Sequence, residues 1–315
     1  MAGVFLDGDH EGLGVKIGNE GLPVEWRFPS ITTILDAVRP LRILVIGEAI
    51  TDVYYFVTPI GISQKDAIVT WRERRREDYD GGATACANHL RDFGDNVGLF
   101  TQSRPLLKQR YLFDPFGIKV FAIEDVTVSE NLAKLEVSAP LRNYDVVIVA
   151  DYGHGVITES LIGQLMQHSR FLAVMAQSNS ANFGFNLVTR YPRADYVALD
   201  EMEVRLAMQD RYGPIEPLAD KLRQRMDARM LAVTLGHRGC LVVDALGQTL
   251  TPVLSNTVVD RIGAGDAFFS ITAPCVALGA TREQIGRIGN AAGAIAVRTM
   301  GNKAPVTRAE LETML

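Results

Sequence analysis

The sequence predicts an α/β fold, with a central and mostly parallel sheet covered by helices on both faces. Several short apolar runs without alternation support this, because strands buried on both faces have that pattern. These runs lie at residues 42–47, 97–100, 146–150, 172–176, 196–199 and 231–234. Helical patterns between them, as at 161–168 and 202–208, predict parallel strands joined by helices. Ligands of such folds bind beyond the carboxyl ends of the strands.

Composition narrows the class of protein. The 315 residues are 47% hydrophobic and 22% charged, which is ordinary for a globular protein with a sizeable core. A net charge of −5 argues against binding to nucleic acid, and no apolar run is long enough to span a membrane. The start of the chain lacks the basic residues of a signal peptide. Three cysteines, far apart in apolar settings, predict reduced thiols, so we expect a cytoplasmic protein.

Two stretches stand outside the strand–helix alternation. Residues 1–40 are rich in glycine at first and then helical in pattern at 31–38, and we interpret them as a leader or linker before a domain at 41–315. Residues 52–80 are rich in β-formers and predict a small separate sheet. Their charged run, 72–77, is mixed in sign. It favours a solvated strand edge over a phosphate-binding patch.

A glycine-rich turn leads into an almost charge-free stretch at 267–280, which predicts a buried helix. Gly263, Ala264 and Gly265 allow a ligand to approach the backbone, and free N–H groups at a helix start attract anions. A carboxylate at Asp266 suits a general base that takes a proton from a hydroxyl beside a phosphoryl group. The plain alternative is a tight turn with a capping aspartate.

The stretch VVDRIGAGDAF resembles the second signature of the ribokinase/PfkB sugar kinases, usually D-T-x-G-A-G-D. The resemblance implies a ribokinase-like fold whose small sheet, at about 52–80, is a lid over the sugar and often the dimer contact. It also implies that Asp266 is the catalytic base and that residues 263–265 form an anion hole. Arg261 and Ile262 stand where the signature usually has small hydroxylated residues.

The resemblance also implies where the acceptor sugar binds. Asp52, at the end of the first strand region, matches an aspartate that binds sugar hydroxyls, and Gly81 and Gly82 match backbone contacts. Ala85 stands where the family usually has an asparagine. Either Asn88, nearly one helical turn later, takes over its contact with the sugar, or this contact is lost. Lys108 resembles the lysine of a K-x-R pair, for which exposed strand charge is the plain alternative.

Two further stretches depart from the family pattern in the phosphate region. Asp151, which the resemblance assigns to the acceptor sugar, ends a buried strand and begins DYGHG. This stretch resembles an SDYxKG stretch, and His154 replaces its lysine. A phosphate contact there would become weaker and pH-dependent. Residues 177–179, Gln-Ser-Asn, replace a D-P-K stretch and remove a second lysine.

The resemblance implies ATP and Mg²⁺ as cofactors. The residues that it assigns to the nucleotide are Thr234, Gly236, Gly239 and Asn290. Asp200 and Glu203 correspond to an N-x-x-E motif that organises Mg²⁺ through water, and oxygen ligands suit that ion. Two acids at a helix start are also ordinary partners of the helix dipole.

The sequence therefore predicts an ATP-dependent kinase that phosphorylates a heptose or hexose, or its phosphate. The resemblance points to the heptose-phosphate kinase branch and to kinase-like domains fused to a nucleotidyltransferase-like domain, which would make residues 1–40 a linker from a longer protein. A homodimer formed through the lid is expected. The alternatives are an inactive regulatory domain that binds sugar or nucleotide, and a nucleoside kinase.

Overall fold

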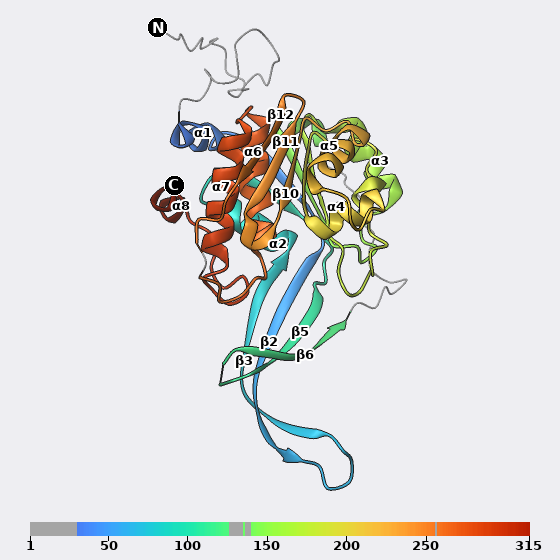
Figure 1. Cartoon of the computed structure of the whole chain (residues 1–315), viewed down its shortest axis with the longest axis vertical. Helices are drawn as coiled ribbons and strands as arrows, with labels where there is room; N and C mark the ends of the chain where they lie inside the picture. The colour runs from blue at the N-terminus through green and yellow to red at the C-terminus, as the bar shows by residue number, and fades with distance from the viewer. Residues whose placement is uncertain (1–29, 126–134, 136–139, 256) are drawn as a thin grey trace.

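Two sheets organise the chain (Figure 1). The computed structural model describes residues 30–125, 135, 140–255 and 257–315, so residues 1–29 of the predicted leader lie outside it, as does Asn256. An eight-stranded sheet forms the body in the order β12-β11-β10-β9-β8-β7-β1-β4. A four-stranded sheet, in the order β3-β2-β5-β6, projects from the body as the lid.

The body sheet confirms the predicted α/β fold. Its strands are β1 Arg42–Gly47, β4 Asn96–Phe100, β7 Val146–Asp151, β8 Leu172–Ala176, β9 Tyr196–Asp200, β10 Met230–Thr234, β11 Cys240–Asp244 and β12 Gly247–Thr251. The neighbours from β4 to β10 pair in parallel, and β11 and β12 add an antiparallel edge. The antiparallel edge follows from short connections, which cannot accommodate the crossover that parallel strands require.

Helices cover both faces of this sheet (Figure 1). One core contains residues of α1 Ile31–Val38, α2 Ala83–Leu90, α6 Ala264–Ala277, α7 Arg282–Ala296 and α8 Arg308–Met314. The other contains residues of α3 Glu159–His168, α4 Glu201–Met208 and α5 Ile215–Arg225. Short 3₁₀ helices are η2 Leu141–Asn143, η3 Val188–Arg190 and η4 Gly236–Arg238.

Two of these helices bear on the predictions. Helix α6 is buried from Asp266 to Ala277, as its charge-free sequence predicted. Helix α1 buries Ile34, Leu35 and Val38 in the same core. The α1 segment therefore packs as part of the body, which corrects the interpretation of residues 31–40 as linker.

The lid is larger than the predicted stretch 52–80. Its strands are β2 Ala49–Ile62, β3 Val69–Gly82, β5 Leu106–Phe113 and β6 Ile118–Asp125. Strand β5 pairs with β2 only as far as Val57, so the ends of β2 and β3 continue as a two-stranded ribbon (Figure 1). The charged run 72–77 lies on the edge strand β3 and is mostly exposed, as expected for a solvated edge.

Two expectations from composition can be compared with the structure. Cys86, Cys240 and Cys275 are buried and form no disulfide. In the part of the chain that the structure describes, no helix is both long enough and apolar enough to cross a bilayer.

Candidate active site

The centre of the candidate site is the start of helix α6. Gly263 is its N-cap in a left-handed conformation, φ 83°, which glycine adopts without strain. No side chain among the described residues caps this terminus, so the first N–H groups of the helix can bind an anion. A Cβ atom added to Gly265 would meet nothing within 4 Å, so this side of the turn faces open space.

Asp266 lies in the first turn of α6 and is only 8% exposed. Its Oδ1 accepts a hydrogen bond from the Tyr152 hydroxyl at 2.8 Å. Burial raises the pKa of Asp266 to about 6; the Tyr152 hydrogen bond lowers it, the charge of Asp52 raises it, and that of Lys108 lowers it. A carboxylate with this pKa is deprotonated at neutral pH and basic enough to accept a proton. The structure thus brings together Asp266, Asp52 and Lys108.

Asp52 lies at the base of the lid on β2. Its buried carboxylate forms an ion pair with Arg110 of β5. Gly81 faces it closely, since an added Cβ would lie 2.6 Å from Asp52 Oδ2. Gly82 has φ 62° and packs against the carbonyl of Glu48, so a side chain would not fit there either. These glycines allow the lid strand to pass directly over Asp52.

Lys108 is a buried cation at this site, with 6% of its surface exposed. It lies on β5 beside Asp52, which is its register partner on β2. Among the described residues Lys108 has neither an ion-pair nor a hydrogen-bond partner, although its charge acts on Asp266, Glu48 and His154. A buried cation without a fixed partner is suited to bind an anionic ligand. This burial contradicts the plain alternative of the sequence analysis, in which Lys108 is only an exposed charge on a strand.

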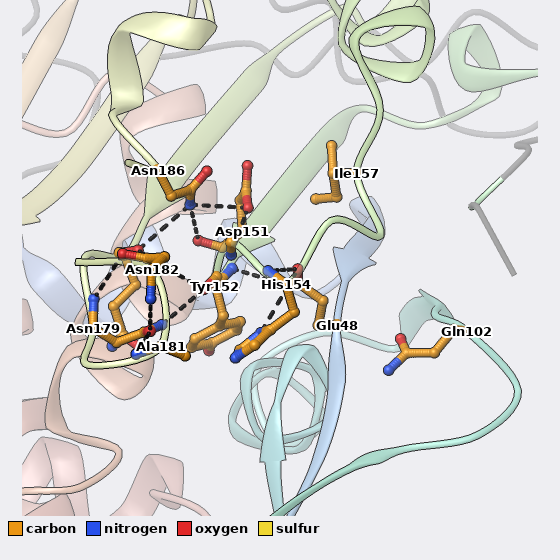
Figure 2. A network of polar contacts seen from close by, with 12 residues as sticks. Glu48, Gln102, Asp151, Tyr152, His154, Ile157, Asn179, Ala181, Asn182 and Asn186 are labelled. Atoms are coloured by element: carbon orange, nitrogen blue, oxygen red, sulfur yellow. Dashed lines mark hydrogen bonds and ion pairs between the residues drawn. The ribbon is translucent and has the colours of Figure 1, made fainter. Parts of the chain in front are cut away.

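Glu48 was not predicted and is completely buried. Its carboxylate accepts hydrogen bonds from the backbone N–H groups of Tyr152 and, at 2.9 Å, His154 (Figure 2). Burial, and then the charge of Asp151, raise the pKa of Glu48 to about 8. Glu48 fixes the backbone of the residue whose hydroxyl contacts Asp266. A signal for it was present in the sequence: a charged residue directly after the buried strand β1.

Asp151 does not face open space. Its carboxylate is 1% exposed and accepts a hydrogen bond from Asn186 Nδ2 at 3.0 Å (Figure 2). It also accepts from the N–H of Gly153 at 3.0 Å and from the Tyr191 hydroxyl at 2.7 Å. A guanidinium nitrogen of Arg190 lies 3.4 Å from Asp151 Oδ2. These partners occupy the carboxylate, so Asp151 supports the loop after β7, and the structure corrects its assignment to the sugar.

The asparagine-rich loop after β8 supports the same segment. Asn179 and Asn182 donate to the carbonyl of Tyr152 at 2.7 and 3.1 Å (Figure 2). Asn182 also binds the carbonyl of Gln177 at 3.0 Å. The stretch 177–179, which replaces the D-P-K pattern, therefore positions Tyr152 through backbone contacts.

His154 is 1% exposed, and neither ring nitrogen has a hydrogen-bond partner among the described residues. Its Nδ1 lies 3.9 Å from Glu48 Oε1. Burial, with a contribution from the charge of Lys108, lowers the pKa of His154 to about 4. The ring is neutral at pH 7. The expected pH-dependent phosphate contact therefore does not arise near neutral pH.

The side chain of Asn88, on α2, contacts the lid strand β3. It donates to Asp80 at 3.2 Å, and Asp80 alternates along β3 with Gly81, which faces Asp52. Asp80 and Asn88 both line a pocket of about 310 Å³. The remaining lining residues are Thr51, Asp78, Tyr79, Asn302, Lys303 and Pro305. Asn88 therefore does not replace the asparagine missing at Ala85, and the structure corrects that assignment.

The residues assigned to the nucleotide lie at the carboxyl end of β10 and beyond it. Gly236 and Gly239 have φ 60° and 94°, and Gly239 packs against the carbonyl of Thr251. Asn290 donates to the carbonyls of Thr251 and Pro252 at 2.9 and 2.8 Å, so its amide nitrogen holds this segment in place. Thr234 ends β10 and is half-buried.

Asp200 and Glu203 form a capping box at the start of α4. Asp200 Oδ1 accepts from the N–H of Glu203 at 2.7 Å, and Glu203 Oε2 accepts from the N–H of Asp200 at 2.8 Å. Glu203 Oε1 accepts from Ser178 N at 3.0 Å. Burial, and then the charge of Asp200, raise the pKa of Glu203 to about 8. The two acids therefore act as partners of the helix start, which was the alternative to a metal site. Each of the carboxylate oxygens named here still keeps a lone pair that can accept another hydrogen bond.

A metal fits this site only with ligands from outside the protein. Among the described residues no group of three or more His, Cys, Asp or Glu side chains is placed to hold an ion. Mg²⁺ commonly binds through few carboxylates together with water and substrate phosphates. The buried Glu203 also feels the charge of Asp266, so a divalent cation near both would be favourable.

The fold is that of the ribokinase-like class of α/β proteins. Ribokinase from Thermotoga maritima superimposes with a TM-score of 0.66 at 18% identity, covering 87% of this chain and 99% of that one. A mutant of phosphofructokinase-2 from Escherichia coli gives a TM-score of 0.65 at 12% identity, covering 87% of this chain and 98% of that one.

The chain belongs to the pfkB family of carbohydrate kinases, whose model matches residues 129–309. It is 27% identical to a D-beta-D-heptose 7-phosphate kinase from Bordetella bronchiseptica, over 88% of this chain and 96% of the relative. It is 24% identical to the bifunctional protein HldE of Shewanella piezotolerans, over 88% of this chain. The chain spans only 64% of that relative.

Proposed function

We propose that this protein transfers the γ-phosphoryl group of ATP to a hydroxyl of a heptose- or hexose-type sugar or sugar phosphate. The observation that carries the proposal is the buried Asp266 at the uncapped start of α6, with Asp52 and Lys108 beside it. ATP supplies the phosphoryl group, and Mg²⁺ neutralises part of its charge. The name of the relative from Bordetella bronchiseptica, a D-beta-D-heptose 7-phosphate kinase, agrees with this substrate class.

In this reaction the residues of the candidate site have different roles. Asp266 accepts the proton of the acceptor hydroxyl as its oxygen bonds to the γ-phosphorus and the bond to ADP breaks. The N–H groups of the turn at 263–266 stabilise the charge on the transferred group. Asp52 binds hydroxyls of the sugar, and the ammonium group of Lys108 binds an anionic oxygen. Glu203 would hold Mg²⁺ through water, and the ion would supply positive charge beside the phosphates.

The remaining assignments concern the nucleotide. We assign Thr234, Gly236 and Gly239 to its phosphates and ribose. Asn290 lines the adenine side through the segment that it holds. An atom added at the Cβ position of Gly236 would meet nothing within 4 Å, so the backbone of this residue is open to a ligand.

Charged groups around Asp52 support a sugar rather than a nucleoside as acceptor. Arg110 and Lys108 flank this carboxylate on the lid. Tyr54, the aromatic residue next to them on the same face, is fully buried and so cannot stack on a base. A binding domain without turnover is the second candidate, and the neutral, buried His154 favours it by leaving fewer cations near the phosphates.

The test is phosphoryl transfer from ATP and Mg²⁺ to a panel of hexoses, heptoses, their phosphates and nucleosides. Sugar-dependent formation of ADP supports the proposal and identifies the acceptor. ATP or sugar binding in calorimetry without turnover on the whole panel supports the binding domain. Turnover restricted to nucleosides contradicts the sugar assignment.

The pH dependence should report the protonation of Asp266. Because the base must be deprotonated, kcat/KM should rise with pH and reach half its maximum near pH 6. Tyr152→Phe removes a hydrogen bond that lowers this pKa, so the midpoint should move to higher pH. Tyr191→Phe is the matched control, because that hydroxyl contacts Asp151 instead. An unchanged midpoint in Tyr152→Phe would argue against Asp266 as the titrating base.

We also propose that the lid forms the contact of a homodimer. The ribbon beyond β5 exposes Ile60, Ile62 and Ile68, and an isolated two-stranded ribbon is only marginally stable in water. Sedimentation equilibrium should give about twice the 34.5 kDa of the chain. An Ile62→Glu/Ile68→Glu variant should dissociate, whereas Phe185→Ser, at an exposed phenylalanine elsewhere, should not. A wild-type monomer at micromolar concentration would refute this contact.

A further inference from the structure

Asp260, which lies just before the turn at 263–266, forms hydrogen bonds with the lid. It is 6% exposed, and its Oδ1 accepts a hydrogen bond from Lys119 Nζ of β6 at 2.6 Å. Its Oδ2 accepts from the hydroxyl of Tyr54 on β2 at 2.9 Å. Two lid strands therefore bind one carboxylate six positions before Asp266.

The same carboxylate organises the backbone around the turn. Oδ1 also accepts from the N–H of Ile262 at 3.3 Å, and Oδ2 accepts from the N–H of Gly301 at 3.2 Å. Gly301 has φ 56° and lies against the rings of Tyr79 and Tyr54, which leave no room for a Cβ. Asp260 thus joins the lid, the turn and the segment at 301 through four hydrogen bonds.

Apolar side chains also join the lid to the residues around Asp260. Tyr54, Phe56, Tyr79 and Leu112 form a small core inside the lid, and Ile262 and Met300 pack against it from the body. This packing gives a reason for isoleucine at 262, where the family signature has small hydroxylated residues. The turn at 260–263 is therefore fixed to the lid by both charge and apolar contact.

Contacts of Tyr54 connect Asp260 with the proposed sugar site. The guanidinium of Arg110 lies 5.6 Å from the ring centre of Tyr54 and pairs with Asp52. Lys119 Nζ lies 5.9 Å from the centre of the same ring. Burial alone would raise the pKa of Asp260, but Lys119 and the Tyr54 hydroxyl outweigh it and lower that pKa. Asp260 is thus a charged acceptor at neutral pH.

We propose that Lys119 and Asp260 are positioning residues, whose ion pair fixes the turn at 260–266 to the lid and so places Asp266 and the anion hole. The inference rests on the proposed kinase function. Neither residue needs to touch the substrate. A small displacement of the reacting groups is costly, and about 1 Å can lower the rate about 100-fold.

The experiment compares Lys119→Met, Lys119→Arg and Asp260→Asn with the double variant Lys119→Met/Asp260→Asn. Lys119→Met keeps the apolar stem and leaves Asp260 three donors, so the fold should survive. We expect kcat to fall about tenfold in Lys119→Met, with both KM values within about twofold, and to recover in Lys119→Arg. The double variant should be no slower than the slower single variant, because both changes break one interaction.

Hydrogen exchange gives a readout that does not depend on activity. Amides at 261–266 should exchange faster in Lys119→Met than in the wild type, with no ligand added. Lys221→Met, at an exposed lysine on α5 and outside the lid, should change neither exchange nor kcat. Fully additive effects on kcat, or unchanged exchange at the turn, would overturn the inference. Faster exchange in a protein without kinase activity would instead refute the proposed function and retain the contact between lid and turn.

Discussion

Asp266→Asn should lower kcat by about 10²–10⁴-fold, because the amide cannot accept the proton of the acceptor hydroxyl. The KM values should change little, since the amide keeps the size of the carboxylate and can still accept from Tyr152. Steady-state rates of ADP formation at pH 8 measure the effect. Asp244→Asn is the matched control: that carboxylate pairs with Arg282 at the end of β11, and its loss should leave kcat unchanged.

The same variant should not be less stable. Asp266 has a folded pKa of about 6 against an ordinary value of 3.8, so folding binds protons between these values. Its contribution to stability is therefore present at low pH and is lost as pH rises through this window. An amide removes this cost at neutral pH, and the melting temperature at pH 7 should hold or rise. Lost activity together with a large fall in melting temperature would point to misfolding rather than to a missing base.

Two alanine substitutions at the turn should separate folding from catalysis. Gly263→Ala places a side chain at φ 83° and against Asn302 Oδ1, so it should cost about 1–3 kcal/mol of stability. It should also lower kcat, by up to about 10²–10³-fold, because refitting the turn around the added methyl group moves backbone N–H groups of the anion hole out of place. Thermal unfolding and steady-state kinetics measure the two effects.

Gly265→Ala is the partner variant. An added methyl group there meets no protein atom, and alanine is favoured over glycine in a helix, so stability should hold or rise by about 0.5–1 kcal/mol. Activity should still fall, because the methyl group enters the space where we place the transferred phosphoryl group. Wild-type kcat and KM in Gly265→Ala would contradict that placement.

Much of the fold could be predicted because its signals are local. Continuous apolar runs predicted the parallel strands β1, β7 and β8, and the charge-free stretch after Asp266 predicted the buried helix α6. The turn itself could be identified from adjacent residues, since glycines and a carboxylate at the start of a helix already define an anion-binding geometry. The strand pattern at 52–80 likewise predicted a separate sheet but not its third and fourth strands.

The details of the candidate site depended on contacts between distant residues. Asp151 and Asn88 carry groups suited to bind sugar, but their neighbours in the fold occupy them, and no periodicity reveals that. Glu48 acts 104 and 106 positions away along the chain, on the backbone of Tyr152 and His154. The lid contacts of Asp260 span 206 positions to Tyr54 and 141 to Lys119.

The class of fold, the family resemblance and the turn at 263–266 with the proposed base could all be predicted from the order of the residues. These follow from hydrophobic periodicity and from residue order within a single turn, which a short segment contains in full. Three features became visible only in the folded chain: which polar groups are occupied, which are left open, and the contact between the lid and the turn. Burial and pairing depend on distant segments meeting, and the direction of a pKa shift depends on them in turn.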